Sequence, residues 1–354
     1  MPTRSVLRVD RQQILGFRRR VSALDERLPP GARSIEIAAF GGLQDSMPRA
    51  AQLSLFARVD GVGPAAWEQP PLVQVWGPRF SAYAVAERDL AVFTVGRHPD
   101  GPVQRRRAET LAAQLREHLG SESRPYDEVG AALGVNPNRL RYATTTGTLL
   151  LRWEGARRPL IRSIPAPEID AGEARRELAR RYLRVFGPGT AQGFSAWAGI
   201  PPTGATAAFD GLTASLTRVR SPIGEGWILS ADEAELRRAR GQDRTAPARL
   251  LPSGDTLFLL QGRERELLVS DPANRARLWT SRVWPGAVLV GGEVCGTWRR
   301  AREVVSVEMW KEPSAAEREA IEAEALALPL PGLEGTPIRL RWQPERSGRL
   351  QPAR

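Results

Sequence analysis

The chain has 354 residues, of which 42% are hydrophobic and 26% charged, and its formal net charge is +11. These proportions are typical of a globular protein, and the length suits roughly two to three domains with their own cores. One cysteine, Cys295, and two histidines, His98 and His118, exclude a structural zinc site, an iron–sulfur cluster and a disulfide framework. We therefore expect no metal and no cofactor.

The positive charge comes almost entirely from arginine, because Lys311 is the only lysine. A genome rich in G and C explains the ratio of Arg to Lys, but it does not explain the excess of positive over negative charge. Guanidinium groups bind phosphate in a bidentate way, so the excess favours a polyanionic partner. No segment approaches the ~18 apolar residues of a membrane span, and the N-terminus lacks the apolar region of a signal peptide. We expect a cytoplasmic, nucleoid-associated monomer with no membrane partner.

Familiar catalytic motifs are missing from the sequence. It contains no GxxxxGK[ST] loop, no GxGxxG after a strand and no GxSxG turn. A single lysine makes covalent amine catalysis improbable. Any catalysis is therefore expected from carboxylates, amides and water.

The N-terminal part, residues 1–120, predicts a first winged helix. Its helices are expected in DRQQILGFRRRVSAL and in a segment that ends near Ala57, and its strands in LVQVWGPRFSAYAV. Between them GGLQDSMPRAA, residues 41–51, is expected to begin a helix, with Gln44, Asp45 and Ser46 ahead of Pro48. Asp or Ser accepting backbone N–H bonds is typical of a helix N-cap, and Pro favours the first turn.

The next part, residues 121–168, gives the clearest copy of the same pattern. A short amphipathic helix is predicted from Asp127 to Leu133, Gly134 supplies a tight turn, and Asn136 can cap a second helix that runs to about Thr145. TLLLRW and RPLIRSI then form strands joined by an EGAR turn. Helix, turn, helix and hairpin in this order predict a winged helix.

A third copy is predicted over residues 169–248. It contains a long helix from Glu173 to Phe186, a helix capped by Thr190 and ended by Gly199, a helix over residues 205–212, and a hairpin of SLTRVR and GWILS. Phe194 and Trp197 are expected in its core. Residues 249–354 are rich in strands and include the amphipathic helix EPSAAEREAIEAEALAL. The fold class is thus α+β, mainly α with β-hairpins: three tandem winged-helix modules and a β-rich α+β C-terminal domain.

Winged helices with a net positive charge favour binding of double-stranded DNA. Arg139 and Arg141 lie within the second helix of the second module, the position that can reach a groove of the duplex. Winged helices also serve as protein-interaction modules, and an Arg on an exposed helix is often only solvated. Three copies on one basic chain favour DNA.

The sequence resembles the AlkZ-like, or YcaQ-like, winged-helix DNA glycosylases over nearly the whole chain. The resemblance is carried by GLQ followed by PRAAQLSLFARVDG, by QVWGPRFSAY, by YLRVFGPGTAQGFSAWAGI, by RLLPSGDTLFLLQGRER and by VLVGGEVCGTWRR. It implies three winged helices and a β-rich C-terminal part around a concave DNA-binding surface. It also implies a monofunctional glycosylase that removes alkylated or crosslinked bases with a pair of side chains, Gln, any residue, then Gln or Asp.

The sequence departs from this family pattern at the catalytic pair. Gln44 matches the first position, but Ser46 occupies the second, and Asp45 offers a carboxylate one residue early. Two interpretations stay open: the segment only caps a helix, or it contacts water and base. In the second, Asp45 stabilises an oxocarbenium-like sugar while Gln44 holds the attacking water.

Other arginine and aromatic residues are candidates for DNA contact. The hairpin reads Arg79-Phe80-Ser81-Ala82-Tyr83 where many relatives have Arg-Gly-Thr-x-His, and Arg79 and Tyr83 could bind phosphate or stack on a base. Alternatively, Arg79 is solvated and Tyr83 lies between modules. The remaining candidates for phosphate binding are Arg263, Arg265, Trp298, Arg299 and Arg300. For the last three, the alternative is a strand with Trp298 packed inward.

Two functions of different classes follow from the sequence. The first is a monofunctional DNA glycosylase that acts on alkylated or crosslinked bases. The second is a DNA-binding protein without enzymatic activity, a regulator or damage binder that lacks the catalytic pair.

Overall fold

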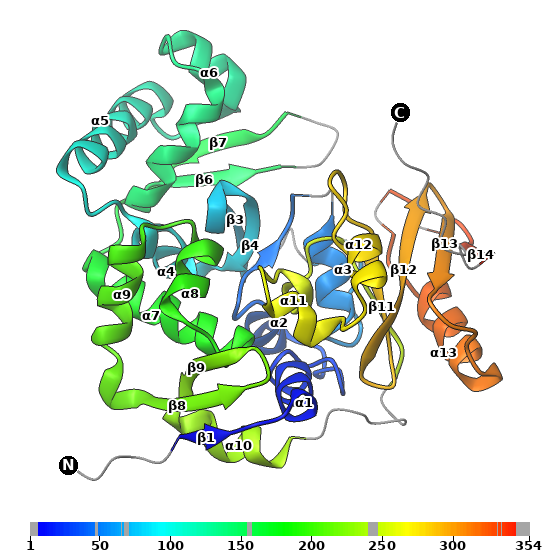
Figure 1. Cartoon of the computed structure of the whole chain (residues 1–354). Helices are drawn as coiled ribbons and strands as arrows, with labels where there is room; N and C mark the ends of the chain where they lie inside the picture. Colours follow the sequence, from blue (N-terminus) through cyan, green and yellow to red (C-terminus); the bar gives the residue numbers. More distant parts are fainter. Residues whose placement is uncertain are drawn as a thin grey trace, which may run out of the picture.

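A computed structural model shows a mixed α/β chain whose strands form three sheets within its described part (Figure 1). The structure describes residues 6–46, 49–64, 66, 71–153, 158–239, 247–330, 332–333 and 335–344. The first sheet and the C-terminal sheet lie in different regions of the molecule, with helices between them.

The first sheet has six strands in the spatial order β2, β4, β3, β6, β7, β5. Their bounds are Leu43–Gln44, Ala82–Ala86, Leu72–Trp76, Leu149–Arg152, Leu160–Ser163 and Ser123–Pro125. The predicted hairpins β3–β4 and β6–β7 are antiparallel pairs, as expected from their alternating apolar residues. Pairing of Gln74 with Leu151 joins the two hairpins into one sheet. The predicted EGAR turn between β6 and β7 lies outside the described residues.

The second sheet joins the beginning of the chain to its middle. β1 (Leu7–Arg8) runs parallel to β8 (Leu216–Ser221), which pairs with β9 (Gly224–Leu229) in the predicted hairpin. The N-terminal strand thus belongs to the sheet of the expected third module. Hence the first and third segments contribute strands to one sheet.

The third sheet contains the C-terminal strands in the order β10, β11, β12, β13, β14. Their bounds are Arg249–Leu251, Gly286–Val290, Glu293–Ala301, Val304–Met309 and Arg339–Gln343. The pairs are antiparallel except β13 with β14, which is parallel. Helix α13 (Ala315–Leu326) begins at a capping box formed by Ser314 and Glu317 and buries Ile321 and Ala325 against this sheet.

Helices occur at most of the predicted places, but α5 (Pro102–Leu119) and several short helices were not predicted, and two segments differ from the prediction. The α-helices outside the C-terminal sheet are α1 (Arg11–Val21), α2 (Ala32–Ala38), α3 (Ala50–Phe56), α4 (Leu90–Thr94), α5 (Pro102–Leu119), α6 (Tyr126–Ala132), α7 (Ala171–Phe186), α8 (Ala191–Ala198), α9 (Pro202–Asp210), α10 (Glu233–Arg238), α11 (Glu264–Leu268) and α12 (Pro272–Leu278). The segment after Asn136 is a 3₁₀ helix, η5 (Pro137–Thr146), although Asn136 caps it as predicted. In segment 41–51 the helix begins later than predicted: β2 comes first, and α3 starts at Ala50.

The largest core contains α7, α8 and α9 together with β3, β4 and the segments after β10. Within it Tyr182, Phe186, Phe194 and Trp197 pack ring to ring at centroid distances of 5.4 to 6.3 Å. Phe194 and Trp197 are buried there, which confirms their predicted place in the core. No helix of the described residues is long and apolar enough to cross a lipid bilayer.

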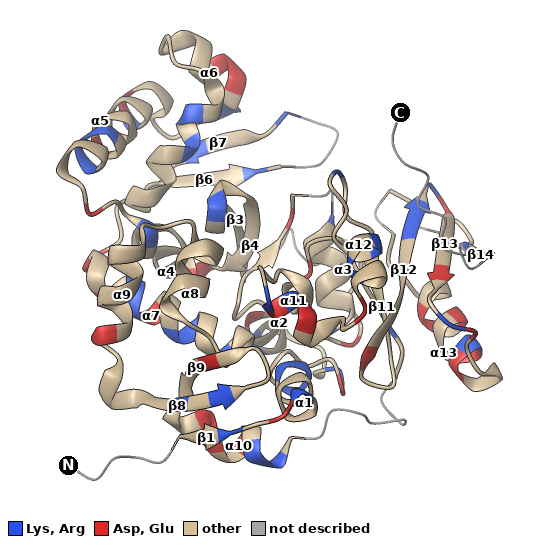
Figure 2. Cartoon of the chain, viewed as in Figure 1, with Lys and Arg blue, Asp and Glu red and all other residues tan. Residues whose placement is uncertain are grey.

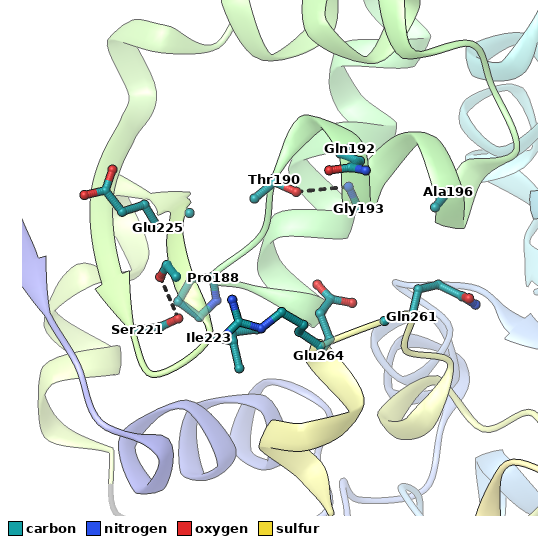
Figure 3. A pocket seen from close by; sticks show the side chains of 14 residues that line it. Pro188, Thr190, Gln192, Gly193, Ala196, Ser221, Ile223, Glu225, Gln261 and Glu264 are labelled. Carbon is teal, nitrogen blue, oxygen red and sulfur yellow. Dashed lines mark hydrogen bonds between the residues drawn. The ribbon is translucent and has the colours of Figure 1, made fainter. Parts of the chain in front are cut away.

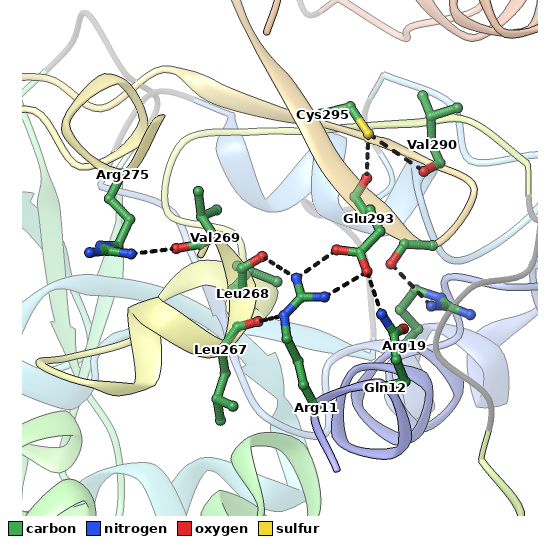
Figure 4. Close-up of polar contacts among 11 residues, drawn as sticks. Arg11, Gln12, Arg19, Leu267, Leu268, Val269, Arg275, Val290, Glu293 and Cys295 are labelled. Atoms are coloured by element: carbon green, nitrogen blue, oxygen red, sulfur yellow. Dashed lines mark hydrogen bonds and ion pairs between the residues drawn. The ribbon is translucent and has the colours of Figure 1, made fainter. Parts of the chain in front are cut away.

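Ion pairs between distant segments hold the C-terminal part against the N-terminal helices. Arg11 of α1 binds both carboxylate oxygens of Glu293 at 2.8 and 2.7 Å and donates to the carbonyl oxygens of Leu267 and Leu268 (Figure 4). Gln12 donates to the same carboxylate at 3.2 Å. Because these contacts link α1, α11 and β12, the parts expected to be separate modules are packed together.

Candidate active site

Gln44 ends β2 at the edge of the six-stranded sheet, and Asp45 and Ser46 follow it outside the strand. Gln44 of β2 pairs with Tyr83 of β4, and the backbone N–H of Asp45 donates to the carbonyl oxygen of Ala82 at 2.8 Å. The Gln44 Nε2 donates to the Ser46 Oγ at 3.2 Å, so these two side chains meet, whereas Asp45 is buried.

Asp45 faces the interior and is only 2% exposed. Its Oδ1 accepts the backbone N–H of Ala51 in the first turn of α3 at 3.0 Å, and its Oδ2 accepts the Nε2 of Gln74 at 2.8 Å. Burial raises the pKa of Asp45 to about 7, against the lowering effects of these bonds and of the Arg49 guanidinium. The expected direct contact of Asp45 with a sugar is therefore not what this geometry offers, because the carboxylate caps a helix from six residues away.

Gln74 connects Asp45 to the next hairpin. Its Oε1 accepts the backbone N–H of Trp153 at 2.6 Å, while its Nε2 donates to the Asp45 carboxylate. A polar residue inside the apolar strand LVQVW thus ties the motif segment to the end of β6. This buried bridge fixes the position of β2 relative to the neighbouring hairpin.

The Gln44 side chain lies beside the β3–β4 hairpin and the LLPSGD segment. Its Oε1 is 3.4 Å from the Nη2 of Arg79 and 3.5 Å from the hydroxyl of Tyr83, which is fully buried. Gly254, in the LLPSGD segment, lies so close that a Cβ there would be 3.4 Å from the Gln44 amide. The predicted residues Gln44, Ser46, Arg79 and Tyr83 are therefore brought together.

The turn between β3 and β4 has an unusual backbone. Arg79 and Phe80 both have positive φ angles, 53° and 56°. Residues other than glycine rarely adopt positive φ angles, and each such residue costs of order 1–3 kcal/mol. Gly199 packs directly on the turn, since a Cβ at that position would be 3.0 Å from the Arg79 Cα. Such strain is concentrated at functional sites, and here it places Arg79 and Phe80 beside Gln44.

Arg79 belongs to this turn, and Arg97 and Arg265 lie near it. None of these three arginines has a carboxylate within ion-pair distance in the described part of the chain. Arg97 is buried and donates to the carbonyl oxygens of Ala198 and Trp76, while its Nη2 has no partner. Burial, with a smaller contribution from the nearby Arg79, lowers the pKa of Arg97 to about 9, so the group stays charged at neutral pH. Arg265 stacks on Trp279, and its pKa is lowered by burial and by Arg79. An anion would relieve this repulsion.

Two hollows flank Phe80. We call the first the aromatic pocket; it has a volume of about 330 Å³. Its main lining residues are Ser46, Trp76, Phe80, Tyr126, Arg141 and Trp153. We call the second, of about 1100 Å³, the basic groove. It runs beside α5, on which Figure 2 marks several Lys or Arg positions in blue, and its charged lining residues are Arg97, Arg106, Arg107 and Arg139.

A further pocket of about 460 Å³ lies between α8, the β8–β9 hairpin and α11 (Figure 3). It contains Arg263, which is exposed as expected for a phosphate contact, but also the carboxylates of Glu225 and Glu264. The hydroxyl of Tyr182 donates to Glu264 at 3.3 Å. The mixed charge makes this pocket a weaker site for a polyanion than the basic groove.

The residues predicted from GTWRR lie on β12 of the C-terminal sheet. Trp298 is 4% exposed, and its indole N–H donates to the carbonyl oxygen of Leu251 at 2.8 Å. It is thus unavailable for DNA contact, as in the alternative with Trp298 packed inward. Arg299 is exposed and Arg300 half-buried. None of the contacts found for Gln44, in the residues that the structure describes, involves this pair.

Sequence reasoning missed Arg97, Gln74 and the role of Phe80. Gln74 carried a signal, since it is a polar residue at a buried strand position. Arg97, in the loop segment VGRHPD, carried none, because its place beside Arg79 results from long-range packing. Within the described residues, no group of three or more His, Cys, Asp or Glu side chains could hold a metal ion.

The arginines of the site favour a polyanionic ligand, and comparison with known proteins identifies the class of protein. The structure is similar to that of Streptomyces sahachiroi DNA glycosylase AlkZ, with a TM-score of 0.76 and 16% sequence identity, over 95% of this chain and 100% of that one. At this identity the similarity shows the fold. No curated protein matches the chain.

The family is shown by the sequence itself. The family model described as DNA glycosylase AlkZ-like matches residues 37–329. The chain therefore belongs to the AlkZ-like DNA glycosylase family, which confirms the resemblance found in its motifs. The matched region includes Gln44, the β3–β4 turn and the arginines around it.

Proposed function

We propose that this protein is a monofunctional DNA glycosylase that hydrolyses the N-glycosidic bond of alkylated or crosslinked bases in double-stranded DNA. One observation carries the proposal. Gln44, at the end of an edge strand, and Ser46 lie with the Nε2 and Oγ 3.2 Å apart, beside charged arginines that no carboxylate of the described residues neutralises. Family membership supports DNA as the substrate.

The reaction needs little from the protein beyond binding and placement of water. An alkylated cationic base leaves readily, so the transition state has oxocarbenium character at the sugar. The Gln44 amide and the Ser46 hydroxyl together hold a water molecule. Its oxygen forms the bond to the sugar carbon, the bond to the base nitrogen breaks with its electron pair on the base, and the water proton passes to solvent through the hydroxyl.

Asp45 takes part as a positioning residue. Both of its oxygens accept hydrogen bonds from within the protein, so it holds β2 against α3 and Gln74. This assignment replaces the expected contact of Asp45 with the sugar. Arg79 and Arg97 supply the charge that draws the DNA backbone to Gln44.

We further propose that three winged-helix modules, residues 1–120, 121–168 and 169–248, precede a C-terminal domain over residues 249–354. Each proposed module has helices and an antiparallel hairpin: β3–β4, β6–β7 and β8–β9. Arg139 of η5 lines the basic groove, and Arg141 lines the aromatic pocket. The second module therefore contributes side chains for duplex binding.

A second candidate function is a DNA-binding protein without catalytic activity. It is favoured because, among the described residues, no carboxylate contacts the Gln44 side chain, and Asp45 is buried. The arginines and the basic groove would serve this function equally well.

Release of free base from a duplex that contains 7-methylguanine separates the two functions. The wild type is expected to release the base and leave heat-labile abasic sites. Gln44→Ala should slow release about 100-fold, the effect of losing one well-placed polar group, with unchanged duplex affinity. Gln192→Ala, in the pocket of Figure 3, is the matched control and should keep the rate. Absence of release by the wild type, with duplex binding intact, would leave only the second function.

A further inference from the structure

Tyr83 lies directly opposite Gln44 in the six-stranded sheet. The two residues are paired in register between the antiparallel strands β2 and β4, so their side chains are cross-strand neighbours. The hydroxyl of Tyr83 is 3.5 Å from the Oε1 of Gln44. Among the residues that the structure describes, Gln44 supplies the only hydrogen-bond partner of this hydroxyl. A buried hydroxyl that lost its partner would be costly, so the two side chains depend on each other.

Two glycines hold the Tyr83 ring in place. A Cβ at Gly77 would lie 2.9 Å from the Cδ2 of the ring, and a Cβ at Gly42 would lie 3.0 Å from the Cδ1. The Tyr83 side chain is 0% exposed and belongs to the largest core. The ring therefore packs closely at both Cδ positions and exposes no surface to a ligand. A side chain in this position can act on a substrate only through its neighbours.

Two donors approach the same oxygen of the Gln44 amide. The Nη2 of Arg79 is 3.4 Å from the Oε1 that the Tyr83 hydroxyl also approaches. Arginine offers donors alone, and burial raises the pKa of Tyr83 to about 12, so its hydroxyl keeps its proton. An amide turned by half a rotation would place its own N–H groups against both donors. The Nε2 therefore points the other way, where it donates to the Ser46 Oγ at 3.2 Å.

We infer that Tyr83 is a positioning residue, whose buried hydroxyl holds the Gln44 amide with its nitrogen toward Ser46 and the attacking water. The inference rests on the proposed function, because it concerns the amide that holds the water there. Arg79 is half-buried and also draws the DNA backbone, whereas Tyr83 cannot reach the DNA. Tyr83 therefore keeps the amide oriented when DNA binds. Long contacts of this kind at catalytic groups commonly shorten in the complex with substrate.

Tyr83→Phe tests the inference because it removes the hydroxyl and leaves the ring. Release of 7-methylguanine from a duplex should slow about tenfold, with unchanged duplex affinity. In the Gln44→Ala background the same change should leave the remaining rate unaltered, because no amide is left to orient. An equal slowing in both backgrounds would show a general structural effect and would overturn the inference.

Tyr182→Phe is the matched control for the loss of a buried hydroxyl. Tyr182 is 1% exposed, and its hydroxyl donates to Glu264 at 3.3 Å. No contact of this hydroxyl in the described residues involves Gln44, so the variant should keep the rate of base release.

The orientation of Gln44 can also be measured by NMR without any reaction, in protein that contains isotope-labelled glutamine. The side-chain signals of Gln44 are identified by their loss in Gln44→Ala. Exchange of these amide protons with water should be about tenfold faster in Tyr83→Phe, because the amide loses a restraining hydrogen bond. Gly77→Ala keeps the hydroxyl but displaces the ring, and it should act in the same direction if Tyr83→Phe does not fold.

Equal exchange of the Gln44 amide protons in the wild type and in the folded variants would overturn the inference. A wild type that releases no alkylated base, but whose exchange differs from the variants as expected, would confirm the orientation of Gln44 by Tyr83. That result would overturn only the proposed chemistry.

Discussion

Two buried arginines of this protein have opposite surroundings. Arg58, 1% exposed, binds both oxygens of Asp255 at 2.7 and 2.8 Å and also contacts the Ser54 carbonyl and the Thr256 hydroxyl. Arg97, 4% exposed, donates to two carbonyl oxygens, lies over the Phe80 ring at 4.4 Å, and keeps one nitrogen without a partner among the residues that the structure describes. Asp255 neutralises Arg58 within the fold. No carboxylate of the described residues neutralises Arg97, so this cation can pair with an anionic ligand.

The contrast follows the location of each group. Arg58 joins α3 to the segment after β10, as the pair of Arg11 and Glu293 joins α1 to β12. Arg97 lies beside Arg79, where like charges oppose each other. Functional sites commonly retain such unfavourable arrangements at the expense of stability. The comparison predicts which arginines affect folding and which affect binding.

Arg58→Met is expected to cause the largest loss of unfolding free energy. It leaves the Asp255 carboxylate, which is also buried, without its cation, and breaking such a pair costs about 3–5 kcal/mol. Urea unfolding should show this loss in the free energy of unfolding. Adding Asp255→Leu should restore much of it, because two apolar side chains replace the pair. A loss below about 1 kcal/mol would mean that the pair is not a structural link.

Asp45→Asn tests a buried acid whose charged form is disfavoured. In the folded protein the pKa of Asp45 is raised from 3.8 to about 7, so the unfolded chain loses this proton first. The contribution of Asp45 to the free energy of unfolding is therefore fully present below about pH 4. It is lost as the pH rises to about 7, by up to ~4 kcal/mol. The variant lacks this titration. The difference in unfolding free energy between wild type and variant should therefore change over pH 4–7, and parallel pH profiles would contradict the assignment.

Arg97→Gln should weaken duplex affinity about tenfold at low salt, because one phosphate contact is lost. The slope of log affinity against log salt should fall by about 0.9. Arg97→Lys keeps the charge and serves as control for the slope. The loss of unfolding free energy should be smaller than for Arg58→Met, since repulsion from Arg79 is relieved. Unchanged affinity together with a large stability loss would make Arg97 a structural residue like Arg58.

Much of the local structure was predictable because hairpins and helix caps depend on neighbouring residues. The strands of β3–β4, β6–β7 and β8–β9 and the cap at Thr190 occur where the sequence placed them. The orientation of Asp45 was not predictable, because it depends on β2 pairing with β4 and not on a helix at residues 41–51. The position of Arg97 follows from packing between distant segments. Local patterns identified Gln44, and long-range contacts determined what surrounds it.

Arg237→Ala on α10 is expected to cause the smallest loss of unfolding free energy among these arginine variants. Arg237 pairs with Glu233 four residues earlier, at 2.7 Å, but its side chain is exposed. Both Arg and Ala favour helices, so the change tests the ion pair alone. Solvent screening reduces such pairs to about 0.3–0.5 kcal/mol, and duplex affinity should not change. Urea unfolding in parallel with Arg58→Met measures the difference. If the two variants lost equal stability, burial and the carboxylate partner would not explain why Arg58 is structural.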